Sequence, residues 1–396
     1  MIDGREGGAT DRLNLDLRTF SAITWPIMEV KLLDLTAQYI PLRKEIRKAM
    51  DELCDAQAFI LGPAVARFER NLAVYCQTKH AIGMSSGTDA LICSLMAMDV
   101  KAGDEVIVPA FTFFATASCA SRLGAKVVFA DIDPRTFNID PADVKRKITP
   151  KTKAIIPVHL FGQMADMEAI NELAAARGIS VIEDAAQAIG AKRDGRRACS
   201  VGACGCLSFY PTKNLGGFGD GGAVCTNDDA LAEKLRLLRV HGAPATNPYQ
   251  HKVIGGMFRL DALQAGVLDV KLKYLDEWHE ARRRNAAIYG RMFAGSKVKA
   301  PHIEPANYSV YNQYVIRVPE RDRVKAKLAE AGVGSAIYYP MPLHLQECFR
   351  PLGYEAGDLP QSESACREVL ALPVYPELTE EQVNYVGEQV LKAVGA

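Results

Sequence analysis

The stretch LSFYPTKNLGGFGDGG, residues 207–222, contains one lysine, Lys213, followed by five glycines within nine residues. Apolar runs at 207–210 and 223–226 flank this turn and are expected to form strands. A lone lysine is usually a solvated surface group, but a glycine-rich turn lets the backbone approach a bound group closely. Because lysine forms Schiff bases with carbonyl compounds, the stretch predicts a covalent site for such a compound. The rival, a phosphate-binding loop, requires a GxxxxGK(S/T) motif that the sequence lacks.

Outward from this stretch, short β-branched runs alternate with helical stretches over residues 80–230. Further strands are expected at 106–108, 126–130, 154–158 and 180–182, and helices at 115–123 and 164–177. Such alternation predicts an α/β fold with a mostly parallel central sheet that helices cover on both faces. Ligands of these folds bind at the carboxyl ends of the strands. The residues that directly follow each strand are therefore the first candidates for a functional site.

The pattern divides the chain into three expected parts. Residues 1–27 lack regular patterning and are expected to be a disordered N-terminal extension, the alternative being a translated leader ahead of a start at Met28. Residues 28–275 are expected to form the large domain that carries the sheet, and residues 276–396 a small C-terminal α+β domain. A strand is expected near 314–318, and the final helix is expected to begin with a capping box at Thr379.

Composition excludes several classes of partner. The 47 basic and 47 acidic residues give a formal net charge of zero, which argues against a nucleic-acid binder. No apolar run approaches the ~20 residues that a membrane span needs. The ten cysteines form no disulfide framework, and the spacing of Cys199, Cys204 and Cys206 fits no common zinc site, so no metal is expected. Reduced thiols in a chain of this size predict a cytoplasmic protein.

Two other stretches place polar groups where ligands bind. In SSGTDAL, residues 85–91, the free N–H groups of a helix start suit a phosphate, although Ser86 or Thr88 could simply cap the helix. In VIEDAAQ, residues 181–187, a strand ends in two acids, and a carboxylate there could face a metal, a ribose hydroxyl or a protonated ring nitrogen. Combined with Lys213, these stretches fit pyridoxal phosphate, which needs a partner for its aldehyde, its ring nitrogen and its phosphate.

At this point the sequence resembles a known family. The motifs SSGTDAL, PAFTFFAT (109–116), VIEDAAQ and SFYPTKNLGGFGDGG strongly resemble those of the DegT/DnrJ/StrS-type sugar aminotransferases, from about Val30 to the C-terminus. The resemblance implies the fold of fold-type I pyridoxal 5'-phosphate-dependent transferases. Members with histidine in place of this lysine are dehydratases, so Lys213 favours transamination.

The resemblance also implies roles for single residues. Lys213 is expected to bind the cofactor's aldehyde and to shuttle protons, and Asp184 to face the ring nitrogen, whose protonated form its negative charge favours. The remaining cofactor contacts are Gln187 at the phenolic oxygen, Phe113 stacked on the ring, and Gly87, Thr88 and Ser208 around the phosphate. The alternatives are a buried core aromatic for Phe113 and a turn hydroxyl for Ser208.

The same resemblance implies glutamate as amino donor, a nucleotide-linked ketosugar as acceptor, and a homodimer with shared active sites. The stretches GGMFRLDALQA (255–265) and YYPMPLHLQ (338–346) look most like members that aminate carbon 3 of the sugar. Candidate substrates are a UDP-2-acetamido-3-keto-uronic acid and a dTDP-3-keto-6-deoxyhexose. The alternatives are amination at carbon 4, and a pyridoxal-phosphate-binding regulator without turnover. An NAD-linked sugar oxidoreductase would need a GxGxxG motif after the first strand, which is not found.

Substrate contacts are expected from four residues: His159, Arg259, Tyr339 and His344. The fork of Arg259 suits a sugar carboxylate or a diphosphate, whereas each histidine could equally be a structural residue. The chain also departs from the family twice. Met257 stands where an asparagine usually reaches the neighbouring subunit's phosphate, and Asn312 replaces a usual histidine, a change whose consequence stays open here.

Overall fold

The computed structural model describes residues 28–244 and 246–395, so the extension expected at 1–27 lies outside the described residues. Its centre is a seven-stranded sheet in the order β1-β9-β8-β5-β4-β2-β3, in which only β9 runs antiparallel to its neighbours. The strands are β1 His80–Met84, β2 Glu105–Pro109, β3 Lys126–Ala130, β4 Thr152–Ile155, β5 Ser180–Asp184, β8 Cys204–Ser208 and β9 Gly222–Thr226. The prediction of an α/β fold with a mostly parallel sheet is confirmed.

Two strands differ from their predicted positions. The strand expected at 154–158 is β4, which spans Thr152–Ile155 and ends before Pro157, a residue with no N–H to donate to a sheet. The run at 207–210 was expected to form a strand, but β8 starts at Cys204 and ends at Ser208. Its first residues, Cys204 and Gly205, give no β-branched signal, and the adjacent Phe209 leaves the ladder to bond Gly221 across the turn, with 2.7 Å between N and O. The lysine turn therefore begins two residues earlier than the sequence pattern indicated.

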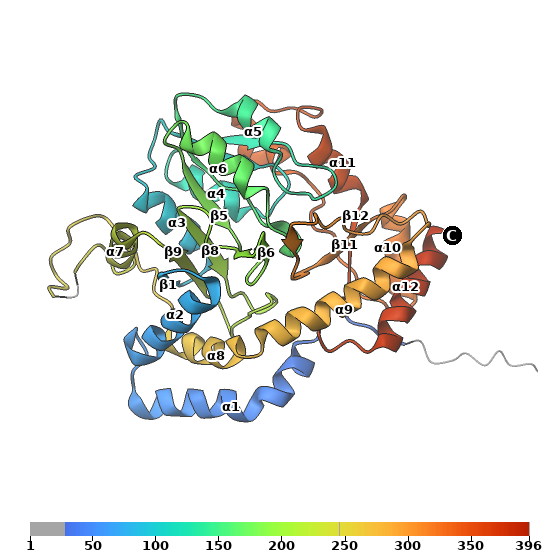
Figure 1. Ribbon diagram of the computed structural model, residues 1–396, viewed down its shortest axis with the longest axis horizontal. Helices are drawn as coiled ribbons and strands as arrows, with labels where there is room; N and C mark the ends of the chain where they lie inside the picture. The colour runs from blue at the N-terminus through green and yellow to red at the C-terminus, as the bar shows by residue number, and fades with distance from the viewer. Residues whose placement is uncertain (1–27, 245, 396) are drawn as a thin grey trace, which may run out of the picture.

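Helices cover both faces of the sheet because its side chains alternate between two apolar clusters (Figure 1). Val106 and Val108 pack under one set of helices, and Ile107 between them packs under the other. The first set is α3 Gly87–Ala97, α4 Ala115–Arg122 and α7 Asp229–Leu238; the second is α2 Gly62–Cys76, α6 Met167–Ala175 and α8 Ala262–Leu272. The outer helix α1 Leu35–Ala56 packs on α8, and α5 Pro141–Lys147 follows β3.

The long helix α9 Leu275–Phe293 leads from the large sheet to a separate C-terminal core (Figure 1). There β11 Tyr314–Arg317 and β12 Val369–Leu372 pair antiparallel, and α10 Arg321–Glu330 and α12 Glu380–Val394 pack beside them. The predicted capping box at Thr379 is present. The remaining elements are η1 Leu160–Gly162, η2 Leu343–Leu345, η3 Glu347–Leu352, α11 Pro360–Glu368, and the small sheet of β6 Lys192–Arg193, β7 Arg196–Arg197 and β10 Asn307–Tyr308.

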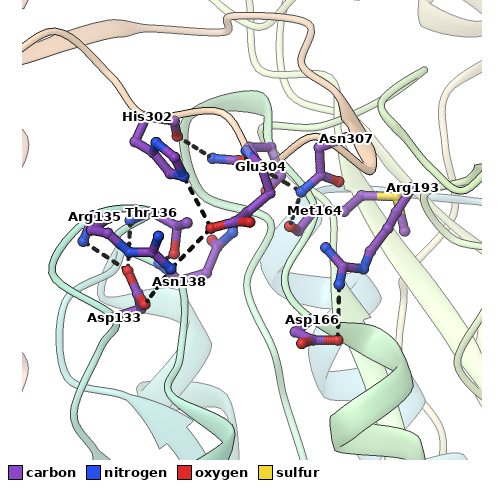
Figure 2. Close-up of polar contacts among 11 residues, drawn as sticks. Asp133, Arg135, Thr136, Asn138, Met164, Asp166, Arg193, His302, Glu304 and Asn307 are labelled. Carbon is purple, nitrogen blue, oxygen red and sulfur yellow. Dashed lines mark hydrogen bonds and ion pairs between the residues drawn. The ribbon is translucent and has the colours of Figure 1, made fainter.

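The C-terminal part is tied back to the large sheet by a polar seam (Figure 2). Arg135, which follows β3, forms an ion pair of 3.0 Å with Glu304, and the side chain of Asn307 donates to the carbonyl of Met164 at 3.1 Å. Some residues beyond 275, such as Leu343 and others of 343–359, also pack in the core of the large sheet. The domain boundary at 275 therefore stays a prediction. In the described part of the chain, no helix is both long and apolar enough to cross a bilayer.

Candidate active site

The lysine turn and the end of β5 meet at the carboxyl edge of the sheet. β5 and β8 are parallel neighbours, so Asp184 at the end of β5 pairs with Cys206, two residues before β8 ends. Lys213 lies in the turn that follows β8, held by a bond of 2.9 Å from its own N–H to the carbonyl of Tyr210. The two side chains are close enough for the charge of each to shift the pKa of the other. The structure thus brings together the two residues that the sequence placed at the centre of the site.

Part of the Lys213 amine is uncharged, and therefore reactive, near neutral pH. Burial lowers its pKa to about 8, although the charge of Asp184 opposes the shift. At pH 7.5 about one such amine in four is uncharged, compared with roughly one in a thousand for an ordinary lysine. An uncharged amine can attack a carbonyl carbon and can accept a proton.

Only one of the two acids at the end of β5 faces the site, because successive side chains of a strand point to opposite faces. The Asp184 carboxylate accepts hydrogen bonds from the hydroxyl of Thr116 at 2.8 Å and from the N–H of Ala186 at 3.2 Å. Burial raises the pKa of Asp184, and these bonds partly offset the shift. Glu183 lies on the other face, where His159 and three backbone N–H groups surround it.

Gln187 is anchored at both ends beside this carboxylate. Its Oε1 accepts from the N–H of Phe161 at 2.8 Å, and its Nε2 donates to the hydroxyl of Tyr339 at 3.1 Å. Since Nε2 carries two hydrogens, one remains for a ligand oxygen. Phe113 is 58% exposed and its ring centroid lies 6.4 Å from that of Tyr339. The alternative of a buried core aromatic is therefore wrong for Phe113, and its ring face is open for stacking.

A cradle for an anion forms where α3 begins. The hydroxyl of Ser86 accepts from the N–H of Asp89 at 3.0 Å, so Ser86 is the helix cap, and the first-turn N–H groups of Gly87 and Thr88 stay available. A Cβ on Gly87 would lie 2.8 Å from the Cβ of Ser208, so only glycine lets the helix start approach that hydroxyl. Within residues 28–244 and 246–395, the Ser208 hydroxyl accepts one weak bond, of 3.4 Å, from the N–H of Tyr210.

The residues present fit pyridoxal phosphate. A buried amine of lowered pKa suits its aldehyde, a buried carboxylate fixed by two donors suits its ring nitrogen, and the glycine-lined helix start suits its phosphate.

Two of the expected substrate contacts are buried inside the protein. The Nε2 of His159 lies 2.8 Å from Glu183, and its Nδ1 accepts from the N–H of Ala165 at 3.1 Å. His159 therefore has no free nitrogen for a sugar, which favours its structural alternative. His344 is also buried, and its Nε2 lies 3.3 Å from Glu363. Assembly with a partner can only bury these rings further.

Arg259 keeps the properties of a ligand-binding residue. Arg259 pairs with Met84 in a short antiparallel bridge. Because Met84 ends β1 shortly before α3 begins, this bridge places Arg259 near the start of α3. Its guanidinium forms no ion pair with any carboxylate of residues 28–244 and 246–395, and its buried Nε has no hydrogen-bond partner there. The expectation that it holds an anionic part of the substrate stays a prediction.

Sequence reasoning missed two supporting residues. The hydroxyl of Thr116 donates a hydrogen bond that holds the Asp184 carboxylate in place. The two residues are 68 positions apart, and a threonine in a predicted helix gives no indication of such a distant contact. Lys271 on α8 is buried and donates to the carbonyl of Gly216 in the lysine turn, and burial lowers its pKa to about 8. A lysine in a helical pattern normally indicates a solvated face, so nothing in the sequence distinguished Lys271.

Fold and site together define a pyridoxal-phosphate-dependent aminotransferase of fold-type I. Residues 41–391 match the model of the DegT/DnrJ/EryC1/StrS aminotransferase family, and the chain belongs to that family. Among solved structures it is similar to DesV of S. venezuelae, at a TM-score of 0.90 and 40% identity over 93% of this chain and 99% of that one. It is also similar to NtdA of Bacillus subtilis with bound PMP cofactor, at a TM-score of 0.88 and 31% identity over 94% and 87% of the two chains.

Two curated relatives cover almost the whole chain. A "pleiotropic regulatory protein" of Geobacillus stearothermophilus is 52% identical over 92% of this chain and 98% of the relative. The UDP-2-acetamido-2-deoxy-3-oxo-D-glucuronate aminotransferase of Pseudomonas aeruginosa is 42% identical over 90% of this chain and 98% of the relative.

Proposed function

We propose that the protein transfers the amino group of glutamate to carbon 3 of a nucleotide-linked ketosugar, in nucleotide-sugar biosynthesis. The observation that carries the proposal is the buried amine of Lys213 beside the Asp184 carboxylate that Thr116 holds, in a chain 42% identical to an aminotransferase named for a 3-oxo sugar. A UDP-linked 2-acetamido-3-keto-uronic acid and a dTDP-linked 3-keto-6-deoxyhexose are the two acceptor classes to test first.

Each residue of the site has a distinct task in such a transfer. Bound pyridoxal phosphate would supply an electrophilic aldehyde and an electron-withdrawing ring. Lys213 holds the cofactor and then accepts and returns a proton, because its pKa of about 8 lies near neutral pH. Asp184 presents a negative charge that two donors hold in place. Gln187 positions Tyr339 at the same edge of the site.

We also propose a cytoplasmic homodimer whose subunits share their active sites. Large apolar side chains are exposed on α1, in the lysine turn and in the segment between α7 and α8, which extends away from the body of the molecule (Figure 1). They include Ile40, Phe218, Tyr249, Ile254 and Met257. Exposed apolar groups of this kind are typical of an interface. Light scattering of the purified protein tests the dimer.

The experiment that tests the function has two steps. The purified holoenzyme is mixed with glutamate, and the absorption band of the cofactor and the release of 2-oxoglutarate are followed. Each ketosugar is then added, and the aminosugar is identified by mass spectrometry and NMR. Release of 2-oxoglutarate followed by amination at carbon 3 is the expected result. Amination at carbon 4, or no release of 2-oxoglutarate, would overturn the proposal.

A regulatory role is the second candidate, because the relative at 52% identity is named as a regulatory protein. Such a protein would bind pyridoxal phosphate through Lys213 but would show no exchange with glutamate. The first step of the same experiment separates the two candidates.

A further inference from the structure

Two side chains of α8 contact the turn that carries Lys213. The Oε1 of Gln264 accepts a hydrogen bond from the N–H of Phe218 at 2.7 Å, and the amine of Lys271 donates to the carbonyl of Gly216. Gln264 and Lys271 are seven positions apart, which is close to two helical turns, so their side chains lie on one face of α8. This helix therefore holds the second half of the lysine turn.

Two glycines of the turn make room for the contact with Gln264. A Cβ on Gly217 would lie 2.7 Å from the Oε1 of Gln264, and a Cβ on Gly219 would lie 2.9 Å from its Nε2. Either Cβ would push the amide of Gln264 away from the N–H of Phe218. These two glycines therefore let the turn close onto a side chain of the protein itself.

The contact made by Lys271 uses a buried amine. Lys271 is 4% exposed, and the carbonyl of Gly216 is the one hydrogen-bond partner that its amine has among residues 28–244 and 246–395. Burial lowers the pKa of Lys271 to about 8, and the charge of Glu377 opposes the shift. A lysine is rarely buried in this way. Its one direct polar contact with the described chain is thus with the turn that carries Lys213.

The turn needs these contacts because its other anchors are few. The side chain of Asn214 donates to the carbonyl of Val310 at 3.1 Å, and the N–H of Gly217 donates to the carbonyl of Phe209 at 2.8 Å. Two anchors leave a chain segment free to rotate about the line that joins them. The contacts with α8 remove that freedom, and with it they fix the direction in which the side chain of Lys213 leaves the turn.

On the side of α1, the turn has room to move. A cavity of about 390 Å³ lies between the turn and α1, and its wall includes Gly217, Phe218 and Lys271. Across it, the rings of Tyr39 and Phe218 meet edge to face with 5.7 Å between their centroids. Losing a contact with α8 would therefore let the turn shift into this space.

We propose that Gln264 and Lys271 are positioning residues, which hold the lysine turn so that the amine of Lys213 meets the aldehyde of the cofactor in a productive geometry. The inference rests on the proposed role of Lys213 in binding the cofactor, and it applies whichever sugar is the acceptor. A misplacement of about 1 Å, even when it is caused far from the chemistry, can lower a rate about 100-fold.

The test compares variants at both positions with a control on the same helix. Gln264→Met replaces the acceptor of the Phe218 N–H by a thioether, which is only a weak acceptor, whereas Gln264→Glu keeps an acceptor oxygen. Lys271→Met removes the donor to Gly216 at a similar side-chain length. Lys273→Met is the control, because Lys273 is exposed at the end of α8.

The readout is the rate at which the full-length apoprotein captures pyridoxal phosphate, followed by stopped-flow absorbance. We expect Gln264→Met and Lys271→Met to capture the cofactor about 100-fold more slowly than the wild type. Gln264→Glu should restore most of the rate, and Lys273→Met should behave as the wild type does. The melting temperature of each variant shows whether it is folded.

Gly217→Ala breaks the same contact from the side of the turn, and it decides the matter if Gln264→Met does not fold. Its added Cβ displaces the amide of Gln264 while Gln264 itself is retained, so capture should again be slow. Folded Gln264→Met or Gly217→Ala proteins that capture cofactor at the wild-type rate would overturn the inference. A Gln264→Glu protein as slow as Gln264→Met would overturn it too, since the acceptor bond would then not be the cause.

The inference and the proposals before it can fail separately. Borohydride reduction and peptide mapping of the wild type identify the lysine that binds the cofactor, and an adduct elsewhere than Lys213 would overturn the role of Lys213 and this inference with it. An adduct on Lys213 with equal capture rates in all variants would overturn the positioning role alone. If capture follows the expected pattern but glutamate releases no 2-oxoglutarate, the proposed function fails and the positioning role stands.

Discussion

Burial sets the protonation of Lys213, and this gives a pH dependence that can be measured. Since the pKa is lowered from 10.5 to about 8, the uncharged amine is the main form only above about pH 8. We expect the rate at which the apoprotein captures pyridoxal phosphate to fall about tenfold for each pH unit below 8 and to level off above it. Stopped-flow absorbance between pH 6 and 10 measures this rate.

Lys213→Arg is the control for that experiment. A guanidinium stays protonated and cannot attack an aldehyde, so borohydride reduction should leave this variant without a covalent adduct in the intact mass. A capture rate that keeps rising through pH 10 would show that Lys213 has an ordinary pKa.

Removing the charge of Asp184 should lower the turnover rate more than it lowers the affinity for the cofactor. Asp184→Asn keeps the shape of the side chain but removes the charge that stabilises a protonated ring nitrogen. Losing an electrostatic contact of the transition state typically costs ~3–4 kcal/mol, or about 10²–10³ in rate. We expect kcat to fall by that factor while the variant retains its cofactor, as absorbance and kinetics will show. Wild-type turnover would mean that Asp184 is not the ring partner.

Among the elements, the contact between β9 and the start of α3 shapes the phosphate cradle. A Cβ on Gly222 would lie 2.4 Å from the carbonyl carbon of Ser86, so Gly222→Ala must displace the first turn of α3. We expect the dissociation constant of the cofactor to rise about 10- to 150-fold, which corresponds to one lost hydrogen bond to a charged group. Fluorescence titration of the apoprotein with pyridoxal phosphate measures this constant.

Gly290→Ala is the matched control for Gly222→Ala. Gly290 lies inside α9, and nothing lies within 4 Å of its added Cβ. Alanine in a helix interior is favoured over glycine by about 0.5–1 kcal/mol, so this variant should be slightly more stable and should bind cofactor normally. A Gly222→Ala protein with the same affinity as this control would contradict the assignment of the cradle.

The buried pair of His159 and Glu183, at the end of β5, contributes to the stability of the fold. Burial alone would raise the pKa of Glu183, but His159 and the surrounding N–H groups outweigh it and lower that pKa. The stabilisation is therefore present at neutral pH and is lost as the pH falls through the lowered value. Removing one partner of a buried pair costs about 3–5 kcal/mol. We expect His159→Leu to lose stability of that size in urea, with an unchanged Michaelis constant for the sugar.

His302→Leu is the control for this pair, because His302 is 42% exposed in its contact with Glu304. Surface pairs contribute about 0–1 kcal/mol. If His159→Leu were as stable as this control and bound the sugar poorly, His159 would belong to the substrate site after all.

At the scale of the whole molecule, the sequence predicted the features that depend on short residue patterns and on the topology of the sheet. The alternation of strands and helices was sufficient to predict the mostly parallel sheet. The rule that ligands bind at strand ends was sufficient to predict that Lys213 and Asp184 share a site, although 29 positions separate them. The sequence did not reveal that His344 is buried, or that Arg282 and Asn312 share a cavity. Those contacts join residues that are distant along the chain, and no local periodicity records them.

In the proposed dimer, Met257 of one subunit is expected to face the cofactor phosphate of the partner subunit. It is 54% exposed, on the segment that pairs with Val240 and continues to Arg259. A thioether is only a weak acceptor and cannot donate, so the cofactor phosphate of a partner subunit would lack one donor. We expect Met257→Asn to supply it and to slow cofactor loss in dialysis by roughly 10- to 150-fold. Met257→Leu, which adds no donor, should behave as the wild type does. If the asparagine and leucine variants lose cofactor equally fast, either residue 257 does not face the phosphate or a water already fills the gap.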